Sequence, residues 1–119
     1  MVSGKERGPA RLPLEGIRIV ELADIVAGPS VGAYLSDFGA DVIKVERIDG
    51  GDAARRMGAM IGDRSAWWVM LGRNKRSVAV NLKDERGCDA LLRLLDTSDA
   101  MVEAYRPGVR DEPKRGPDV

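Results

Sequence analysis

Residues 17–46 read IRIVELADIVAGPSVGAYLSDFGADVIKVE, and this stretch determines the fold class. Two short runs within it, 17–22 and 42–45, have the length and the β-branched content of strands. Between them, Gly28 and Pro29 mark the start of a helix, because proline fits the first helical position without losing a needed hydrogen bond. The order strand, helix, strand predicts a βαβ unit, whose two strands are parallel.

The helix of this unit is expected to bury one apolar face against the sheet. Four apolar residues follow the spacing i, i+3, i+4 and i+7, which places them on one side of a helix: Val31, Tyr34, Leu35 and Phe38. Gly39 follows them directly and is a typical helix stop. We therefore predict that these four side chains form the contact between the helix and the sheet.

The same order of elements recurs later in the chain. Residues 78–82 are a predicted strand, and Asp84 and Glu85 then supply the negative charge that favours a helix start. A further extended run lies at residues 101–103. Two such units side by side predict an α/β fold with an open, mostly parallel sheet and flanking helices.

The segment between the two units, residues 46–76, is rich in glycine, with one short predicted helix near residues 65–71. Irregular stretches of this length are unusual in a small domain. We expect the segment either to be functional or to be covered by polypeptide outside this chain. Trp67 and Trp68 are predicted to be core or interface residues, with a ligand platform as the alternative.

Composition excludes several kinds of protein. Lysine plus arginine equals aspartate plus glutamate, 19 each, so the net charge is zero. This balance argues against non-specific binding to nucleic acid or to an anionic membrane. Histidine is absent and Cys88 is the single cysteine, which excludes an internal disulfide, a cysteine-based zinc site and a Ser-His-Asp or Cys-His catalytic site built from this chain. We expect no bound metal, and we expect Cys88 to be buried.

The first residues differ from the rest of the chain. Residues 1–12 are charged and contain glycine and proline, with no apolar run suited to a signal peptide, and they are predicted to form a flexible tail. Residues 13–119 are then predicted to form one domain segment. No stretch has the roughly 20 apolar residues of a membrane span, so the expected location is the cytoplasm.

Two candidate segments for a phosphorylated ligand lie at predicted strand ends. Residues 26–30 connect a strand to a helix start, where backbone N–H groups attract anions; an ordinary tight turn is the alternative. Alternation along the second strand places Lys44 and Glu46 on one face, and Val45 with Arg47 on the other. A cation there could reach a phosphate, or it could form a solvated ion pair. The dinucleotide pattern G-x-G-x-x-G is not present, so a standard NAD site is not expected.

Two further candidates lie later in the chain. Residues 72–77 contain three cations, which are more often found in a solvated loop but also suit a phosphate site. Residues 103–108 present Tyr105, whose ring could stack on a purine, and Arg106, which could pair with a carboxylate.

The order and spacing of these segments resemble the family III CoA-transferases, which include formyl-CoA transferase, carnitine CoA-transferase and α-methylacyl-CoA racemase. The matching segments are PLEGIRIVEL at 13–22, AGP at 27–29, FGADVIKVER at 38–47, GD at 51–52 followed by Arg55 or Arg56, RNKRS at 73–77, NLK at 81–83 and EAYRPG at 103–108. The resemblance therefore covers nearly all of residues 13–108.

This resemblance implies a Rossmann-like large domain in a subunit several times longer than this chain, so that the present segment would be an incomplete, amino-terminal part of it. Family members form interlocked dimers, and they move CoA between carboxylic acids or racemise an α-methylacyl-CoA. In the transferases a catalytic aspartate forms an acyl-enzyme anhydride and then a thioester with CoA. That aspartate belongs to later sequence, so no catalytic residue is assigned here and the isolated chain is expected to be inactive.

The resemblance also implies which residues would contact CoA. Arg47 would bind its phosphates and Tyr105 would lie beside its adenine, and the full expected set is Val26, Ala27, Arg47, Val80, Lys83, Ala104 and Tyr105. Two departures bear on this site: Ala104 stands where the family usually has asparagine, and Glu112 stands where it has a CoA-contacting arginine. Arg110, Lys114 or Arg115 could compensate for that charge reversal.

Three interpretations remain open at this point. The first is a CoA-binding segment of an acyl-CoA:carboxylate CoA-transferase or an acyl-CoA racemase, working as a homodimer or with a complementing chain. The second is a non-catalytic CoA- or nucleotide-binding module. The third is a decayed fragment without function, which would expose apolar surface and aggregate. Transferase and racemase are not distinguished by these residues, and neither is the acyl group.

Overall fold

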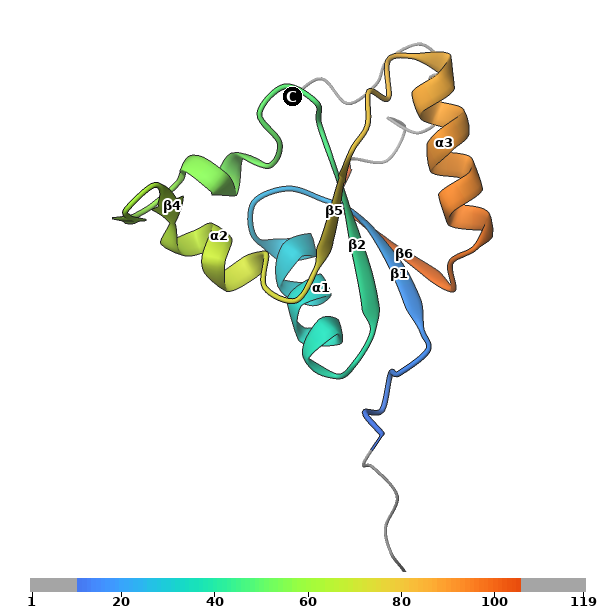
Figure 1. The fold of residues 1–119 in the computed structure, drawn as a ribbon, viewed down its shortest axis with the longest axis horizontal. Helices are drawn as coiled ribbons and strands as arrows, with labels where there is room; N and C mark the ends of the chain where they lie inside the picture. The colour runs from blue at the N-terminus through green and yellow to red at the C-terminus, as the bar shows by residue number, and fades with distance from the viewer. Residues whose placement is uncertain (1–10, 106–119) are drawn as a thin grey trace, which may run out of the picture.

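The computed structural model describes residues 11–105, and four parallel strands form its central sheet (Figure 1). In spatial order these strands are β5 (Arg76–Ala79), β2 (Asp41–Glu46), β1 (Arg18–Leu22) and β6 (Ala100–Glu103). The predicted α/β class and the parallel sheet are confirmed. The charged residues to which the sequence analysis assigned a role at the end of the chain lie outside the described residues: Arg106, Arg110, Glu112, Lys114 and Arg115.

Two helices cover opposite faces of this sheet (Figure 1). Helix α1 (Ala27–Asp37) lies over the face that carries Ile19 and Val42, and α3 (Glu85–Asp96) packs through its leucines on the face that carries Val20 and Val45. Because successive residues of a strand point to opposite faces, β1 and β2 each contribute to both layers. Both βαβ units predicted from the sequence are present, but they are not side by side, because β5 and β6 of the second unit flank β2 and β1 of the first.

The face that α1 turns to the sheet is not the predicted one. Its buried residues are small: Gly28, Pro29, Gly32, Ala33 and Ser36. Val31, Tyr34 and Phe38 are instead 46, 64 and 54% exposed, and only Leu35 of the predicted set packs against the core. The physical reason is distance, since a Cβ at Gly28 would stand 2.1 Å from the Ala23 Cβ. The helix lies too close to the sheet for large side chains, so these face outward.

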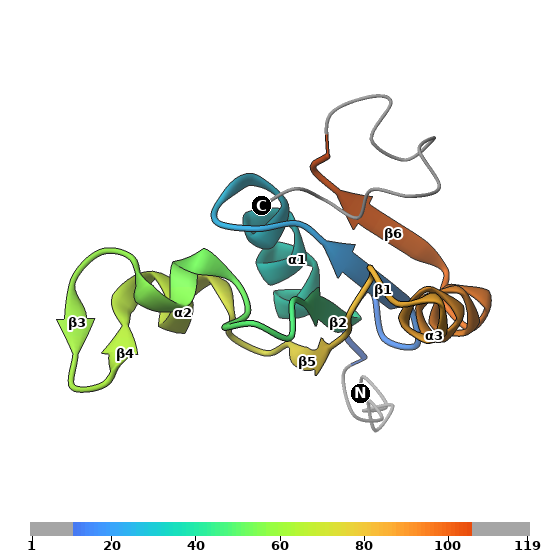
Figure 2. The same cartoon turned by 90° about the horizontal axis from the view of Figure 1, so that it is seen from above.

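The glycine-rich segment is more regular than expected. It contains the 3₁₀ helix η1 (Ala53–Arg56), the short antiparallel strands β3 (Met60–Ile61) and β4 (Arg64–Ser65), and α2 (Ala66–Leu71). Only α2 was predicted from the sequence. Figure 2 shows that β3, β4 and α2 project sideways, beyond α1 and away from α3. Within this arm the Arg55 guanidinium lies 3.7 Å from the centre of the Trp68 ring, a cation–π contact.

Helix α3 begins where Asp84 accepts a hydrogen bond from the Arg86 backbone N–H, as expected for an acidic helix start. Cys88 on this helix is exposed, so its predicted burial is wrong. The helix packs on the sheet through Leu91, Leu94 and Leu95. Cys88 lies outside that stripe, where its thiol donates to the Leu82 carbonyl at 3.1 Å. Among residues 11–105, no helix has the length and apolar content that crossing a bilayer requires.

Candidate functional site

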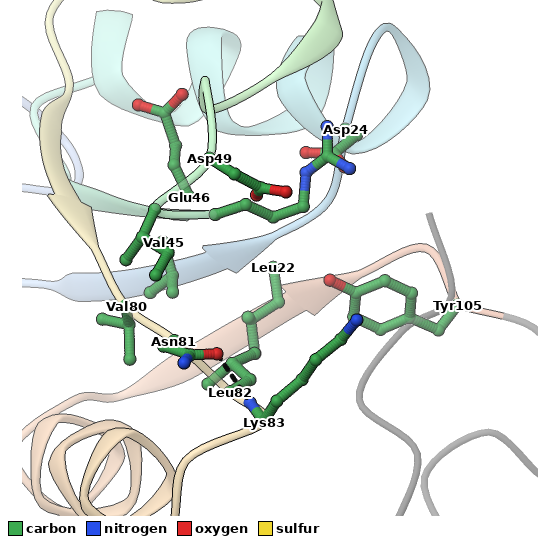
Figure 3. Close-up of a pocket in the computed structure, with 12 residues that line it drawn as sticks. Leu22, Asp24, Val45, Glu46, Asp49, Val80, Asn81, Leu82, Lys83 and Tyr105 are labelled. Atoms are coloured by element: carbon green, nitrogen blue, oxygen red, sulfur yellow. Dashed lines mark hydrogen bonds between the residues drawn. The ribbon is translucent and has the colours of Figure 1, made fainter.

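A pocket of about 270 Å³ opens at the carboxyl ends of the parallel strands (Figure 3). Its walls come from the ends of all four strands, with these lining residues: Leu22, Asp24, Val45, Glu46, Arg47, Ile48, Asp49, Val80, Asn81, Leu82, Lys83 and Tyr105. The chain winds from β1 outward to β2 and β5, then crosses to β6 on the other side of β1. A crevice beside such a reversal of strand order is where open α/β sheets bind ligands.

Four of the seven residues expected to contact CoA meet in this pocket: Arg47, Val80, Lys83 and Tyr105. Val26 and Ala27 lie instead at the amino-terminal end of α1, both exposed, and Ala104 precedes Tyr105 without lining the pocket. Arg47 follows β2, and Val80 and Lys83 follow β5, which is shorter than predicted at its carboxyl end. The Val80 backbone N–H still donates to the Glu46 carbonyl at 2.9 Å, and the chain then leaves the sheet.

Sequence reasoning missed the other lining residues, and chiefly Asp24, Ile48, Asp49 and Leu82. Each of them lies within a few residues of a predicted strand end, so proximity to the carboxyl edge of the sheet was the available signal. What the sequence did not show is which loops bend over the α3 side of the sheet.

The pocket combines charge with an apolar floor. Arg47 and Lys83 are its cations, and Leu22, Val80 and Leu82 are among its apolar residues. Figure 3 shows the Lys83 side chain extending toward the Tyr105 ring, and the Lys83 backbone N–H donates to the Asn81 side chain at 3.1 Å. Such a site suits a ligand with both an anionic group and a ring or other apolar part.

Burial and neighbouring carboxylates raise the pKa of two groups in the pocket, Tyr105 and Asp24. Burial raises the pKa of Tyr105, and the nearby carboxylate of Asp24 raises it further. Burial also raises the pKa of Asp24, with Asp52 adding to the effect. The Tyr105 phenol is therefore protonated across the physiological range, and it can donate a hydrogen bond as well as present its ring.

A buried ionic cluster lies on the face of the sheet that α1 covers. It consists of Glu21, Lys44, Asp52 and Lys75. The Lys44 Nζ lies 2.9 Å from Glu21 Oε1 and 2.7 Å from Asp52 Oδ2, and the Lys75 Nζ lies 2.7 Å from Glu21 Oε2. Burial lowers the pKa of Lys44, but attraction to Glu21 and hydrogen bonds to both carboxylates outweigh it, so the net shift is upward. Lys44 is thus neither a phosphate ligand nor part of a solvated pair, the two alternatives that the sequence left open.

A third buried carboxylate, Glu46, lies on the same face as Lys44, as strand alternation predicted. It accepts hydrogen bonds from Arg55 Nε at 2.8 Å and Arg55 Nη2 at 2.6 Å, from the Asp52 backbone N–H at 2.8 Å, and from the Ser77 hydroxyl. Burial raises the pKa of Glu46, but these donors outweigh it and lower the value to about 2. Glu46 is therefore a carboxylate at any physiological pH.

The basic turn at residues 73–76 does not form an open phosphate site. Arg73 pairs with Asp37 at 2.7 Å, Arg76 pairs with Asp41 at 2.6 Å, and Lys75 belongs to the buried cluster. All three cations hold the turn against α1 and β2. Within residues 11–105, acidic and cysteine side chains form no group of three that could hold a metal ion.

Solved structures with the same fold have been determined for related proteins. A CAIB/BAIF family protein from Brucella suis superimposes with a TM-score of 0.79 at 37% identity, over 87% of this chain and 29% of that one. A hypothetical protein from Mycobacterium tuberculosis superimposes with a TM-score of 0.78 at 41% identity, over 93% of this chain and 30% of that one.

Curated relatives are similar over the same region. The alpha subunit of succinyl-CoA–L-malate CoA-transferase from Chloroflexus aurantiacus is 37% identical over 107 residues, which cover 88% of this chain and 25% of that protein. Human succinyl-CoA:glutarate CoA-transferase is 43% identical over 97 residues, 81% of this chain and 22% of that protein. The chain thus spans about a quarter of the length of these relatives.

The family model described as CoA-transferase family III matches residues 14–118, which is most of the chain. The parallel sheet, the similar solved structures and this match agree: the chain belongs to CoA-transferase family III.

Proposed function

We propose that the pocket at the carboxyl edge of the sheet binds the CoA part of an acyl-CoA, and that the chain is the CoA-binding segment of an enzyme that transfers CoA between carboxylic acids. The observation that supports this most strongly is the meeting of Arg47, Lys83 and Tyr105 around one apolar crevice, in a chain of family III.

The chemistry of the lining fits CoA. CoA carries phosphates, a purine and an apolar pantetheine arm, and it therefore needs cations, a stacking surface and an apolar wall. Arg47 and Lys83 supply charge for phosphates, the Tyr105 ring can stack on the purine, and Val80 and Leu82 supply apolar surface. The acids Asp24 and Asp49 also line the pocket, so the cations are spaced among negative charges and anion binding depends on where each cation is held.

The covalent step is proposed to belong to another part of the enzyme. In this chain the resemblance assigns no residue to the acyl-carrying aspartate, so residues 11–105 would bind and orient CoA. Two relatives are named as the alpha and beta subunits of succinyl-CoA–L-malate CoA-transferase. We propose that a further polypeptide, a second copy or a complementing chain, completes the active site here. The exposed Tyr34 and Phe38 of α1 are suitable contacts for it.

Calorimetric titration of the folded chain with CoA tests this proposal. Loss of a hydrogen bond to a charged group costs about 1.5–3 kcal/mol, so Arg47→Ala should weaken binding roughly 10- to 100-fold. Lys83→Ala should also weaken CoA binding. The matched control is Arg76→Ala, which removes an exposed arginine outside the pocket and should leave CoA affinity unchanged. A folded chain that does not bind CoA, or equal losses in all three variants, would contradict the proposal.

A further inference from the structure

One peptide group connects the pocket to the buried carboxylate behind it. The carbonyl of the Gly51–Asp52 peptide accepts a hydrogen bond from Arg47 Nη2 at 3.3 Å. The N–H of the same peptide donates to Glu46 Oε1 at 2.8 Å. Since a peptide group is planar and rigid, a residue that orients its N–H also orients its C=O.

The carboxylate that orients this peptide is itself held firmly. Glu46 is 4% exposed, and Arg55 binds both of its oxygens in a bidentate pair, while Ser77 donates to one of them. Figure 3 shows the Glu46 carboxylate pointing away from Val80, Leu82 and Tyr105, so it does not face the interior of the pocket. Its hydrogen-bond partners are Asp52 and Arg55, which follow Arg47 in the chain, and Ser77 of β5.

The close approach of Glu46 to the loop also explains the glycine at position 51. Gly51 has φ +68°, and a Cβ there would stand 2.5 Å from Glu46 Oε1. Both the backbone conformation and the space exclude a side chain. Glycine at this position therefore lets the peptide reach the carboxylate.

We infer that Glu46 is a positioning residue: through the Gly51–Asp52 peptide it fixes the Arg47 guanidinium at the wall of the pocket. The inference rests on the proposed function for its consequence, which is that Glu46 contributes to CoA affinity without touching CoA. A neutral glutamine at 46 would present an NH₂ group in place of one acceptor oxygen. Only one of the two oxygen positions would then remain an acceptor, so the bidentate pair with Arg55 would be lost and the side chain that holds the peptide would no longer be fixed.

A double-variant cycle on CoA affinity separates positioning from general structure. Glu46→Gln should weaken CoA binding about 10-fold when Arg47 is present, and should have almost no effect in the Arg47→Ala background, because both changes act through one guanidinium. Asp37→Asn is the matched control, since it removes an arginine-paired carboxylate far from the pocket and should not alter binding. Equal losses from Glu46→Gln in both backgrounds would overturn the inference.

A measurement without ligand keeps the test independent of the proposed function. In an NMR spectrum of arginine side-chain Nε–H groups, the Arg47 signal should shift in Glu46→Gln and in Gly51→Ala, and the Asp52 amide should exchange faster with solvent. If Glu46→Gln does not fold, Gly51→Ala displaces the same peptide. An unchanged Arg47 signal in a folded variant would refute positioning. If the signal shifts while Arg47→Ala still binds CoA normally, the positioning stands and the proposed role of Arg47 in binding fails.

Discussion

Replacing Lys44 with methionine should destabilise the fold more than any surface substitution. Methionine has similar length and no charge, so the change removes the ammonium group that bridges Glu21 and Asp52 and donates to the Ala23 carbonyl at 2.6 Å. After the change Glu21 keeps Lys75 at 2.7 Å. Asp52 loses its buried ion-pair partner and keeps backbone donors.

The magnitude follows from the burial of these groups. Lys44 is 1% exposed and Asp52 is 0% exposed, so water cannot replace the lost partner. Breaking a buried ion pair by removing one member costs about 3–5 kcal/mol, a large share of the roughly 5–15 kcal/mol that stabilises a typical domain. Arg76→Met, which breaks an exposed pair with Asp41, should cost at most about 1 kcal/mol and is the control.

The loss of unfolding free energy in Lys44→Met should also depend on pH, and it should be smaller at low pH. In the native chain burial raises the pKa of Asp52, but its hydrogen bond to Lys44 and further donors outweigh this and lower it. Its stabilising contribution is therefore present above the unfolded pKa and is lost as pH falls through the folded pKa. Without Lys44 the effect of burial dominates and the pKa of Asp52 rises. Protonation of Asp52 then removes the unpaired buried charge and stabilises the folded variant as pH falls. The difference in unfolding free energy should narrow between pH 7 and pH 4.

Urea unfolding followed by circular dichroism at pH 7 and pH 4 measures both effects. Adding Asp52→Asn to Lys44→Met removes the stranded charge and should restore part of the stability, and it supplies a measurable species if the single variant is unfolded in buffer. A loss of unfolding free energy below about 1 kcal/mol, unchanged between the two pH values, would show that the buried cluster does not contribute this stability.

Three further outcomes are expected. Gly32→Ala should destabilise the fold by about 2 kcal/mol or more, measured by urea unfolding, since a Cβ there would stand 1.9 Å from Glu21 Oε2; a neutral effect would mean that α1 can move away from the sheet. Cys88, being exposed, should react with a thiol reagent in the folded chain at a rate near that of the unfolded chain, and slow labelling would contradict its placement. The folded pKa of Glu46 is lowered to about 2, so its contribution to stability is present above the unfolded pKa and is lost as pH falls through 2. The difference in unfolding free energy between the native chain and Glu46→Gln should therefore shrink as pH is lowered from 6 to 2.5. A constant difference would contradict the lowered pKa.

Many residues of the candidate site could be predicted from the sequence, but not which of them come together in one pocket. Arg47, Val80, Lys83 and Tyr105 were expected on the resemblance and on their places at strand ends, and the structure brings them together in one pocket. Val26 and Ala27 were expected there as well, and they lie at the start of α1. A strand end identifies an edge of the sheet, whereas the path of the following loop decides which side of that edge a residue occupies.

The sequence by itself determined the local features of this protein. Period-2 alternation correctly separated Lys44 and Glu46 from Val45. The β-branched runs and the Gly-Pro pair correctly predicted β1, α1 and β2, whereas β5 lies earlier than predicted and η1, β3 and β4 were not predicted. These are short-range properties, because strand and helix periodicity depend only on neighbouring residues.

Only the tertiary structure decided which partners meet. Helix α1 carries apolar residues on one side and small residues on another, and periodicity does not tell which side faces the sheet. The distance of closest approach selects the small side, so Tyr34 and Phe38 point outward. In the same way Glu21, Lys44 and Asp52 come from three segments far apart in the chain. They become one buried cluster only because the parallel strands and the loop after β2 bring both carboxylates within 3 Å of the Lys44 ammonium group. Contacts of that kind depend on long-range packing, which a pattern in neighbouring residues does not encode.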